Sequence, residues 1–479
     1  AISTSAPDPS LSRKMRRSTK VALILAVSIA VAKRAHPKAK LIWLIKRFLG
    51  AIFVRLLPTP KPRIISGTGC TSKVAKALTD LGCKKPLVVT DEMLVSHGLV
   101  KKCTDSLQAA GLEHAVFQDV VPNPHSELVE EGFQIYHNRG CDSIIAFGGG
   151  SPMDVAKIIG AKVCNPKPIL QYEGALMVTT LPRAPQPPPL IAIPTTAGTG
   201  SETSIGAVIT MKEAEQKVII ADLSLVPVVA VLDPELLVKL PKHITAATGM
   251  DALTHAIESF VSNWSTETSR KLSLQASAKI FEHLPASYKD GSDRDARQAM
   301  LLASFEAGAA FTKAGLGYVH AIAHQLGGLF HTPHGTANAM LLPHVLEFYL
   351  QDEDGGSGSC TQLFCHLAQA AALVDPSRGK VMPKREVAEL LVTRLFEMNK
   401  EMQIDSEVKE MKASDVEIVA RRALNEAHGS QHGLVKPLRW LLDVGYPVPK
   451  YMCHKDCCSI VAKVLPLAER EKWLRQGCA

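Results

Sequence analysis

The spacing of apolar residues changes near residue 240, and this change constrains the fold more than any other feature of the sequence. Before it, short apolar runs alternate with helical stretches, and the runs at 86–90, 143–147 and 189–193 are predicted to be buried strands. After it, apolar residues recur every three to four positions, as in 246–261, 272–284 and 297–310. The pattern predicts an α/β domain with a parallel sheet (63–240), then an all-α domain (241–479).

A glycine-rich turn follows the predicted strand 143–147. Residues 148–154 read GGGSPMD, and Pro152 is well placed as the first residue of a helix. Backbone without side chains at a helix N-terminus allows amide groups to reach a pyrophosphate. The loop 194–202 (PTTAGTGSE) follows the strand 189–193, and its threonines could line the nicotinamide end of a dinucleotide. Each turn taken alone is equally consistent with a tight strand–helix connection.

Asp91 lies at the end of the predicted strand 86–90. A carboxylate there can accept hydrogen bonds from the adenosine ribose hydroxyls and would repel a 2′-phosphate, so it favours NAD over NADP. The alternative is an aspartate in a surface turn.

Two helical segments carry side chains that can bind a metal. Asp251 and His255 are one turn apart, as are His320 and His324, and His334 follows ten residues later. A carboxylate with several imidazoles and no thiolate suits Fe(II), Zn(II) or another borderline ion. Any one of these histidines could instead cap a helix or pack in the core.

The sequence around these residues resembles the iron-containing (group III) alcohol dehydrogenases. Four stretches occur in the order of that family, and the resemblance spans roughly residues 60–470: 148–154, 194–202, 249–258 (GMDALTHAIE) and 315–335 (GLGYVHAIAHQLGGLFHTPHG). It implies a dehydroquinate synthase-like architecture and reversible, NAD-linked oxidation of an alcohol, with an ion that lowers the pKa of the alcohol. It also implies a homo-oligomer, since dimers are common in the family.

The resemblance assigns roles residue by residue. The implied metal ligands are Asp251, His255, His320 and His334. The implied cofactor contacts are Gly149, Gly150, Ser151, Asp154, Thr195 and Thr196. His324 is the candidate to relay the proton or to hydrogen-bond substrate. His331 is expected to be a pocket or surface residue rather than a ligand.

One departure from the family concerns the substrate pocket. Better-known relatives read Phe-x-Asn before Ala-Gly-Leu-Gly, whereas this chain has Lys313 in place of the asparagine. A lysine there could attract an acidic substrate or point to solvent, so the family's substrate cannot be carried over. Two other readings stay open: a glycerol dehydrogenase-like polyol oxidoreductase, usually zinc-dependent, and an accessory subunit of a membrane assembly that retains a dehydrogenase fold.

Residues 1–62 form a basic, partly apolar extension with a net charge of +12. Residues 11–20 resemble an organellar transit peptide, 21–32 are apolar but too short to span a bilayer, and 41–57 have the spacing of a basic amphipathic helix. The extension predicts an organellar location, in a mitochondrion or plastid, and binding to a membrane surface or a membrane protein assembly. The helix could equally pack on the protein's own surface. From residue 64 on the net charge is −5, which argues against a nucleic-acid partner.

Eleven scattered cysteines, an odd number, argue against a disulfide framework and for a reducing compartment. Cys453, Cys457 and Cys458 are close in sequence, but no second ligand pair has matching spacing. We therefore predict that they are free thiols.

Overall fold

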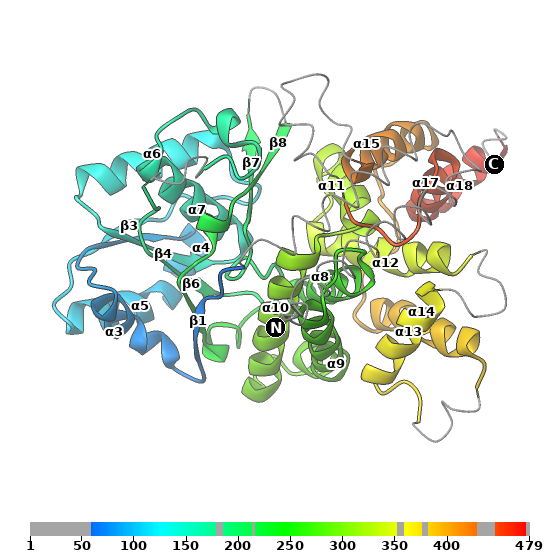
Figure 1. Cartoon of the computed structure of the whole chain (residues 1–479), viewed down its shortest axis with the longest axis horizontal. Coiled ribbons are helices and arrows are strands. Elements are labelled where there is room, and N and C mark those ends of the chain that lie inside the picture. The colour runs from blue at the N-terminus through cyan, green and yellow to red at the C-terminus, as the bar shows by residue number, and fades with distance from the viewer. Residues whose placement is uncertain are drawn as a thin grey trace, which may run out of the picture.

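A six-stranded parallel sheet forms the centre of the N-terminal half in the computed structural model (Figure 1). The structure describes residues 59–178, 185–212, 216–351, 359–375, 382–428 and 446–475. The segments 11–20, 21–32 and 41–57 discussed above lie outside these residues. From one edge of the sheet to the other, the strands are β1 (Arg63–Ser66), β9 (Val229–Leu232), β6 (Leu190–Pro194), β4 (Ser143–Gly148), β2 (Pro86–Val89) and β3 (Ala115–Phe117). The three predicted strands are confirmed to within one residue at each end.

Both faces of this sheet are buried, as a parallel sheet requires. Successive side chains point to opposite faces, so Val88 joins one hydrophobic core while Leu87 and Val89 join the other. Helices cover the two faces (Figure 1). They are α3 (Val74–Asp80), α4 (Glu92–Ser96), α5 (Leu99–Ala109), α6 (Ser126–Asn138) and α7 (Gly150–Cys164). Short 3-10 helices add η2 (Cys70–Lys73), η3 (Ile169–Tyr172), η4 (Leu223–Leu225) and η5 (Pro234–Leu236).

A small second sheet, which the sequence pattern did not predict, lies beside α7. Its strands β7 (Gly206–Met211) and β8 (Gln216–Ala221) pair antiparallel, and β5 (Gly174–Ala175) extends β8 in parallel. The hairpin interrupts the alternation of strands and helices that the first half of the sequence suggests.

From Lys242 to Arg475 the described chain is helical, which confirms the predicted fold class. Fifteen of the twenty residues of α8 (Lys242–Val261) are buried, so this helix lies at the centre of the half. The other helices are α9 (Glu267–Lys289), α10 (Arg294–Ala314), α11 (Tyr318–Phe330), α12 (His334–Leu350), α13 (Ser359–Ala370), α14 (Lys384–Glu401), α15 (Val416–His428), α17 (His454–Val461) and α18 (Leu467–Arg475). The 3-10 helices η7 (Ala413–Asp415) and η8 (Ala462–Val464) complete it.

The loop after β6 joins the two halves. Gly200 has a φ of 59°, and a Cβ there would lie 2.6 Å from the Cα of Gly308 on α10. Only two glycines allow this approach, which brings the loop 194–202 against α10. Gly198 of the same loop packs against Thr248 on α8, the helix that carries Asp251 and His255.

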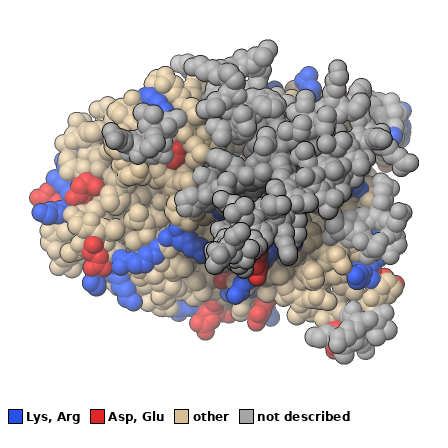
Figure 2. All heavy atoms as spheres, viewed as in Figure 1, with Lys and Arg blue, Asp and Glu red and all other residues tan. Residues whose placement is uncertain are grey.

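Charges on the described surface are mixed. Figure 2 shows acidic and basic side chains next to one another on one face. Exposed ion pairs on the described surface include Lys101–Asp105 (2.7 Å) and Lys102–Glu235 (3.1 Å). Among the described residues, no helix combines the length and apolar character needed to cross a bilayer.

Candidate active site between the two halves

Asp251, His255 and Glu258 lie on one buried face of α8. Positions 251, 255 and 258 are spaced by four and three residues, so the side chains project the same way. Each is at most 4% exposed. Burying two carboxylates is costly unless a cation or hydrogen-bond donors compensate, so this face of α8 needs partners from other helices.

Three imidazoles converge on the carboxylate of Asp251. Its Oδ1 lies 3.8 Å from Nε2 of His255, 3.7 Å from Nε2 of His320 on α11, and 3.5 Å from Nε2 of His334 at the start of α12. Ligands about 2.0–2.2 Å from a tetrahedral ion lie roughly 3.3–3.6 Å from one another. Asp251, His320 and His334 offer ligand atoms that all lie within 4.8 Å of one another, close to the spacing that one divalent ion requires. His255 lies outside this group of three, and its ring stacks on that of His320 with 4.6 Å between centroids.

Asn338, on α12, is fully buried among these groups. Its Nδ2 donates to Oδ1 of Asp251 (2.7 Å) and lies 3.2 Å from Nε2 of both His320 and His334. Its Oδ1 has no hydrogen-bond partner. The amide group of Asn338 thus lies where the lone pairs of Asp251, His320 and His334 converge. A hydrogen-bond donor at that point indicates that the position suits a cation. Sequence reasoning missed this residue, although it lies one turn after His334.

Glu258 fixes the orientation of His320, and it too was not predicted. Its carboxylate lies 2.6 Å from Nδ1 of His320 and accepts hydrogen bonds from the backbone amides of Gly317 (2.9 Å) and Val319 (2.8 Å). A proton on Nδ1 leaves the Nε2 lone pair free for an ion, which is the arrangement common around metal-binding histidines. The signal in the sequence was a lone acid seven residues after Asp251 in an apolar helix.

The pKa values of the clustered groups shift in different directions, because burial and the nearby charges oppose one another. Burial disfavours charge on His320, but hydrogen bonds and charge from Asp251 and Glu258 outweigh it and raise its pKa to about 9. Burial lowers the pKa of His255 to about 4, although the charge of Asp251 opposes this. Burial also opposes ionisation of Asp251, yet the imidazoles hold its pKa well below its ordinary value. The site thus attracts a proton or another cation.

His324, the predicted proton relay, lies next to the ligand cluster. Its ring stacks on that of His334 with 5.3 Å between centroids, and its Nδ1 lies 2.6 Å from Oε1 of Glu426 on α15. Glu426 also accepts hydrogen bonds from the hydroxyl of Tyr446 (2.6 Å) and from Gln325 (2.8 Å). Glu426 therefore holds His324 in place, and no motif or spacing in the sequence indicates this partner. His331 is exposed and ends α11 in a left-handed conformation, as expected for a surface residue.

Lys313 and its neighbour Phe311 lie near the end of α10. Phe311 stacks on His255 with 4.5 Å between ring centroids. Lys313 is partly buried, and burial lowers its pKa. Phe311, two residues before the departure from the family pattern at Lys313, thus contacts the predicted ligand His255 directly.

The glycine turn and the threonine loop lie side by side at the carboxyl edge of the sheet. The backbone amide of Thr195 donates to the carbonyl of Gly148 (3.0 Å), and a Cβ on Gly149 would meet Thr196 at 3.5 Å. Gly150 begins α7, so Pro152 is the third residue of the helix and not the first, as predicted. It still lies in the first turn, where an amide hydrogen has no partner within the helix. No acidic side chain occupies that turn, so its amides can face an anion.

Two of the predicted cofactor residues have partners within the protein. Asp154 accepts hydrogen bonds from the hydroxyl of Ser201 (3.2 Å) and the amide of Val208 (3.0 Å), and burial raises its pKa to about 6. Asp91 caps α4 by accepting from the amide of Leu94 (2.9 Å), and burial raises its pKa. Asp154 therefore braces the loop 194–202, while Asp91 caps the first turn of α4.

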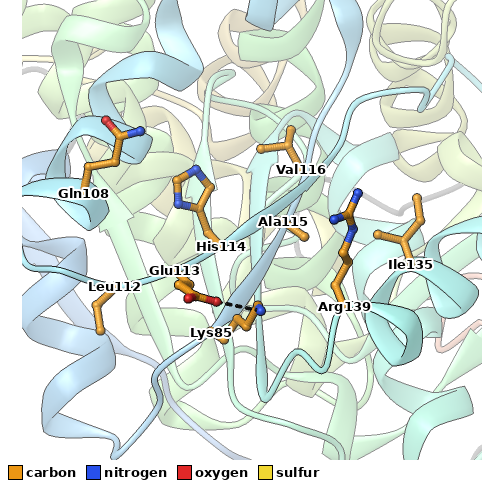
Figure 3. A pocket seen from close by; sticks show the side chains of 9 residues that line it. All are labelled: Lys85, Gln108, Leu112, Glu113, His114, Ala115, Val116, Ile135 and Arg139. Atoms are coloured by element: carbon orange, nitrogen blue, oxygen red, sulfur yellow. Dashed lines mark ion pairs between the residues drawn. The ribbon is translucent and has the colours of Figure 1, made fainter.

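A surface cavity of about 610 Å³ lies elsewhere, at the amino ends of β2 and β3 (Figure 3). Lys85 and Glu113, which line it, form an ion pair of 2.7 Å. None of the predicted site residues lines this cavity, and it lies at the sheet edge opposite to the glycine turn.

Comparison with known proteins agrees with this geometry. The family described as iron-containing alcohol dehydrogenase matches residues 60–234, and the C-terminal part of the Fe-containing alcohol dehydrogenase family matches 245–435. The chain belongs to the iron-containing alcohol dehydrogenases. The predicted family and enzyme class are thereby confirmed.

Individual relatives extend over most of the chain. The NAD-dependent methanol dehydrogenase of Bacillus methanolicus is 38% identical over 369 residues, which cover 76% of this chain and 92% of the relative. The lactaldehyde reductase of Escherichia coli K12 is 36% identical, covering 75% and 91%. The crystal structure of a 1,3-propanediol oxidoreductase superposes with a TM-score of 0.76 at 32% identity, covering 86% of this chain and all of that one.

Proposed function

We propose that this family member transfers hydride between a small alcohol or aldehyde and NAD, with one divalent ion held by Asp251, His255, His320 and His334. The observation that carries the proposal is the convergence of three imidazole nitrogens on one buried carboxylate oxygen, at 3.5–3.8 Å. A bound ion of this kind supplies Lewis acidity, which lowers the pKa of an alcohol.

The remaining chemistry belongs to the protein's own side chains and backbone. His324, oriented by Glu426, is placed to take the alcohol proton and pass it towards solvent. Because His334 is 41% exposed while Asp251 is 4% exposed, the cluster opens on the side of His334, and substrate would enter there. Phe311 and the buried helices exclude water from the other side.

The glycine turn is the proposed pyrophosphate site, through the amides of Gly149, Gly150 and Ser151 at the start of α7. Thr195 and Thr196 are adjacent to it and would contact the nicotinamide part. Asp91 is the proposed acceptor for the ribose hydroxyls, because β2 and β4 are neighbours and their carboxyl ends meet at the same edge. A negative charge there favours NAD over NADP.

Iron is the proposed ion and zinc the alternative, since one carboxylate and three imidazoles suit both. Iron is favoured by membership of the iron-containing family. The relatives named above act on methanol, lactaldehyde and 1,3-propanediol, which supports a short alcohol or aldehyde as substrate.

The test combines metal analysis with NADH oxidation on a panel of short and long aldehydes and polyols. The protein should contain about one iron at this site and reduce short aldehydes, whereas His320→Ala should lose the metal and the activity while remaining folded. His283→Ala, on the partly exposed surface of α9, is the matched control and should keep both. Zinc with a preference for polyols would favour the glycerol dehydrogenase-like reading. A metal-free, inactive wild-type protein would favour an accessory subunit.

We further propose that residues 1–62 bring the enzyme to an anionic membrane surface in an organelle, and that the enzyme is a homo-oligomer. The support for membrane binding is the net charge of +12 beside apolar stretches. Binding to vesicles of anionic lipid should weaken with salt and disappear when residues 1–58 are deleted. A truncated protein that sediments with vesicles as fully as the intact one would contradict the proposal.

A further inference from the structure

A second group of metal-binding side chains lies where α15 meets α17. His454 and Cys458 are one turn apart on α17 and so project to the same side, and Glu417 faces them from the first turn of α15. Their ligand atoms all lie within 4.8 Å of one another. None of these residues belongs to the catalytic cluster. Glu426, which contacts His324, is nine residues beyond Glu417, or about 13 Å along the helix.

The distances within this group match a tetrahedral ion. The Sγ of Cys458 lies 3.6 Å from Nδ1 and 3.8 Å from Nε2 of His454, and 4.0 Å from Oε2 of Glu417. Nε2 of His454 lies 3.4 Å from Oε1 of Glu417. With bonds of about 2.3 Å to sulfur and 2.0–2.2 Å to nitrogen and oxygen, tetrahedral ligands lie roughly 3.3–3.7 Å apart. Small side-chain rotations would bring all three to one ion.

The neighbouring cysteines take other positions. The Sγ of Cys457 contacts the carbonyl of Ala420 in the core (3.8 Å), and burial raises the pKa of its thiol well above its ordinary value. Cys453 is exposed and precedes α17 as its N-cap. One thiol of the three therefore faces the histidine and the glutamate, so the sequence spacing of the cysteines alone did not reveal the group.

We propose that Glu417, His454 and Cys458 form a second, peripheral site for a borderline divalent ion of the zinc type, with water as the fourth ligand. Thiolate together with imidazole favours zinc over magnesium or calcium. The side chains of Glu417 and His454 are 72% and 44% exposed, so an ion can enter from solvent. A bound ion would join α15 to α17 and stabilise the helix that carries Glu426. The ion pair of His454 with Glu417 is the arrangement the ion would replace.

Co(II) distinguishes the two sites, because only the second contains a thiolate. Titration of the full-length protein with Co(II) should produce a thiolate-to-cobalt charge-transfer band in the near ultraviolet. The band should remain in His320→Ala, which removes the catalytic site. It should disappear in Cys458→Ser and remain in Cys453→Ser, the matched control on the same helix end.

The exposed ligands provide variants that do not disturb the core. Loss of an outer-shell partner costs about 10–100-fold in metal affinity, so loss of a direct ligand in His454→Ala or Glu417→Ala should weaken Co(II) binding at least about tenfold. Aldehyde reduction should be unchanged in both variants. Absence of the band in the wild-type protein, its survival in Cys458→Ser, or its loss in Cys453→Ser would overturn the proposal. None of these results bears on the catalytic site, which the His320→Ala metal analysis tests separately.

Discussion

The two halves of the molecule contribute to the active site in different ways. The sheet half presents backbone and small side chains, namely the glycine turn before α7 and the threonine loop after β6, where strand ends meet. The helical half presents charged side chains on buried helices, and each important imidazole there has a carboxylate partner. Single substitutions should therefore reduce metal affinity or activity strongly in the helical half, where each function depends on one side chain. They should have smaller effects in the sheet half, where several backbone amides together would bind the cofactor.

The largest expected effect is on Glu258, in the helical half. Glu258→Gln removes the charge that orients His320, and loss of such a partner typically costs about 10–100-fold in metal affinity. The dissociation constant for Fe(II) or Zn(II) should rise by that factor, measured by competition with a chelator. Glu282→Gln, an exposed glutamate on α9, is the control and should leave affinity unchanged. Equal affinities in the two variants would show that the carboxylate at 258 does not position the ligand.

Glu426→Gln should come next. The substitution keeps the shape but removes the charge beside Nδ1 of His324, so the imidazole loses its preferred orientation. We expect kcat to fall about tenfold or more while metal content stays at the wild-type level, with a larger solvent isotope effect. Loss of metal together with kcat would mean that Glu426 supports the fold of α15 and not the proton relay.

Metal binding should depend on pH through His320. Its pKa in the metal-free protein is raised to about 9, so below pH 9 the ion must displace a proton. Affinity should therefore rise with pH, by about tenfold per unit between pH 7 and 9 for one displaced proton. Zn(II) competition with a chelator in the His454→Ala variant, which lacks the second site, measures this. A constant affinity across that range would contradict a protonated His320.

The smallest effect is expected at Asp91, in the sheet half. Asp91→Asn keeps the N-cap of α4, because asparagine caps as well as aspartate, but removes the charge. The ratio of kcat/KM with NADP to that with NAD should rise about tenfold, which corresponds to about 1.4 kcal/mol. An unchanged ratio would leave Asp91 with its capping role alone. If the ratio changed by a larger factor than the metal affinity changes in Glu258→Gln, the expectation that substitutions have larger effects in the helical half would be wrong.

How much the sequence revealed also differs between the halves. The strand ends and the glycine turn were predicted to within one or two residues, because strands and tight turns depend on neighbouring residues. The small mixed sheet formed by β5, β7 and β8 was missed, and Pro152 lies two residues deeper in α7 than expected. Asp154 and Asp91 were predicted to face the cofactor, and the structure adds hydrogen bonds within the protein that the sequence pattern could not show.

The sequence by itself determined the order of the two domains, the family, and the i, i+4 pairs Asp251–His255 and His320–His324, because this spacing on a helix is a local property. Only the tertiary structure decided which side chains complete the site. Glu258 is 62 residues from His320, Asn338 is 87 from Asp251, and Glu426 is 102 from His324. The group at Glu417 and Cys458 likewise joins residues 41 apart. Such contacts follow from how helices pack against one another, and no spacing along the chain encodes them.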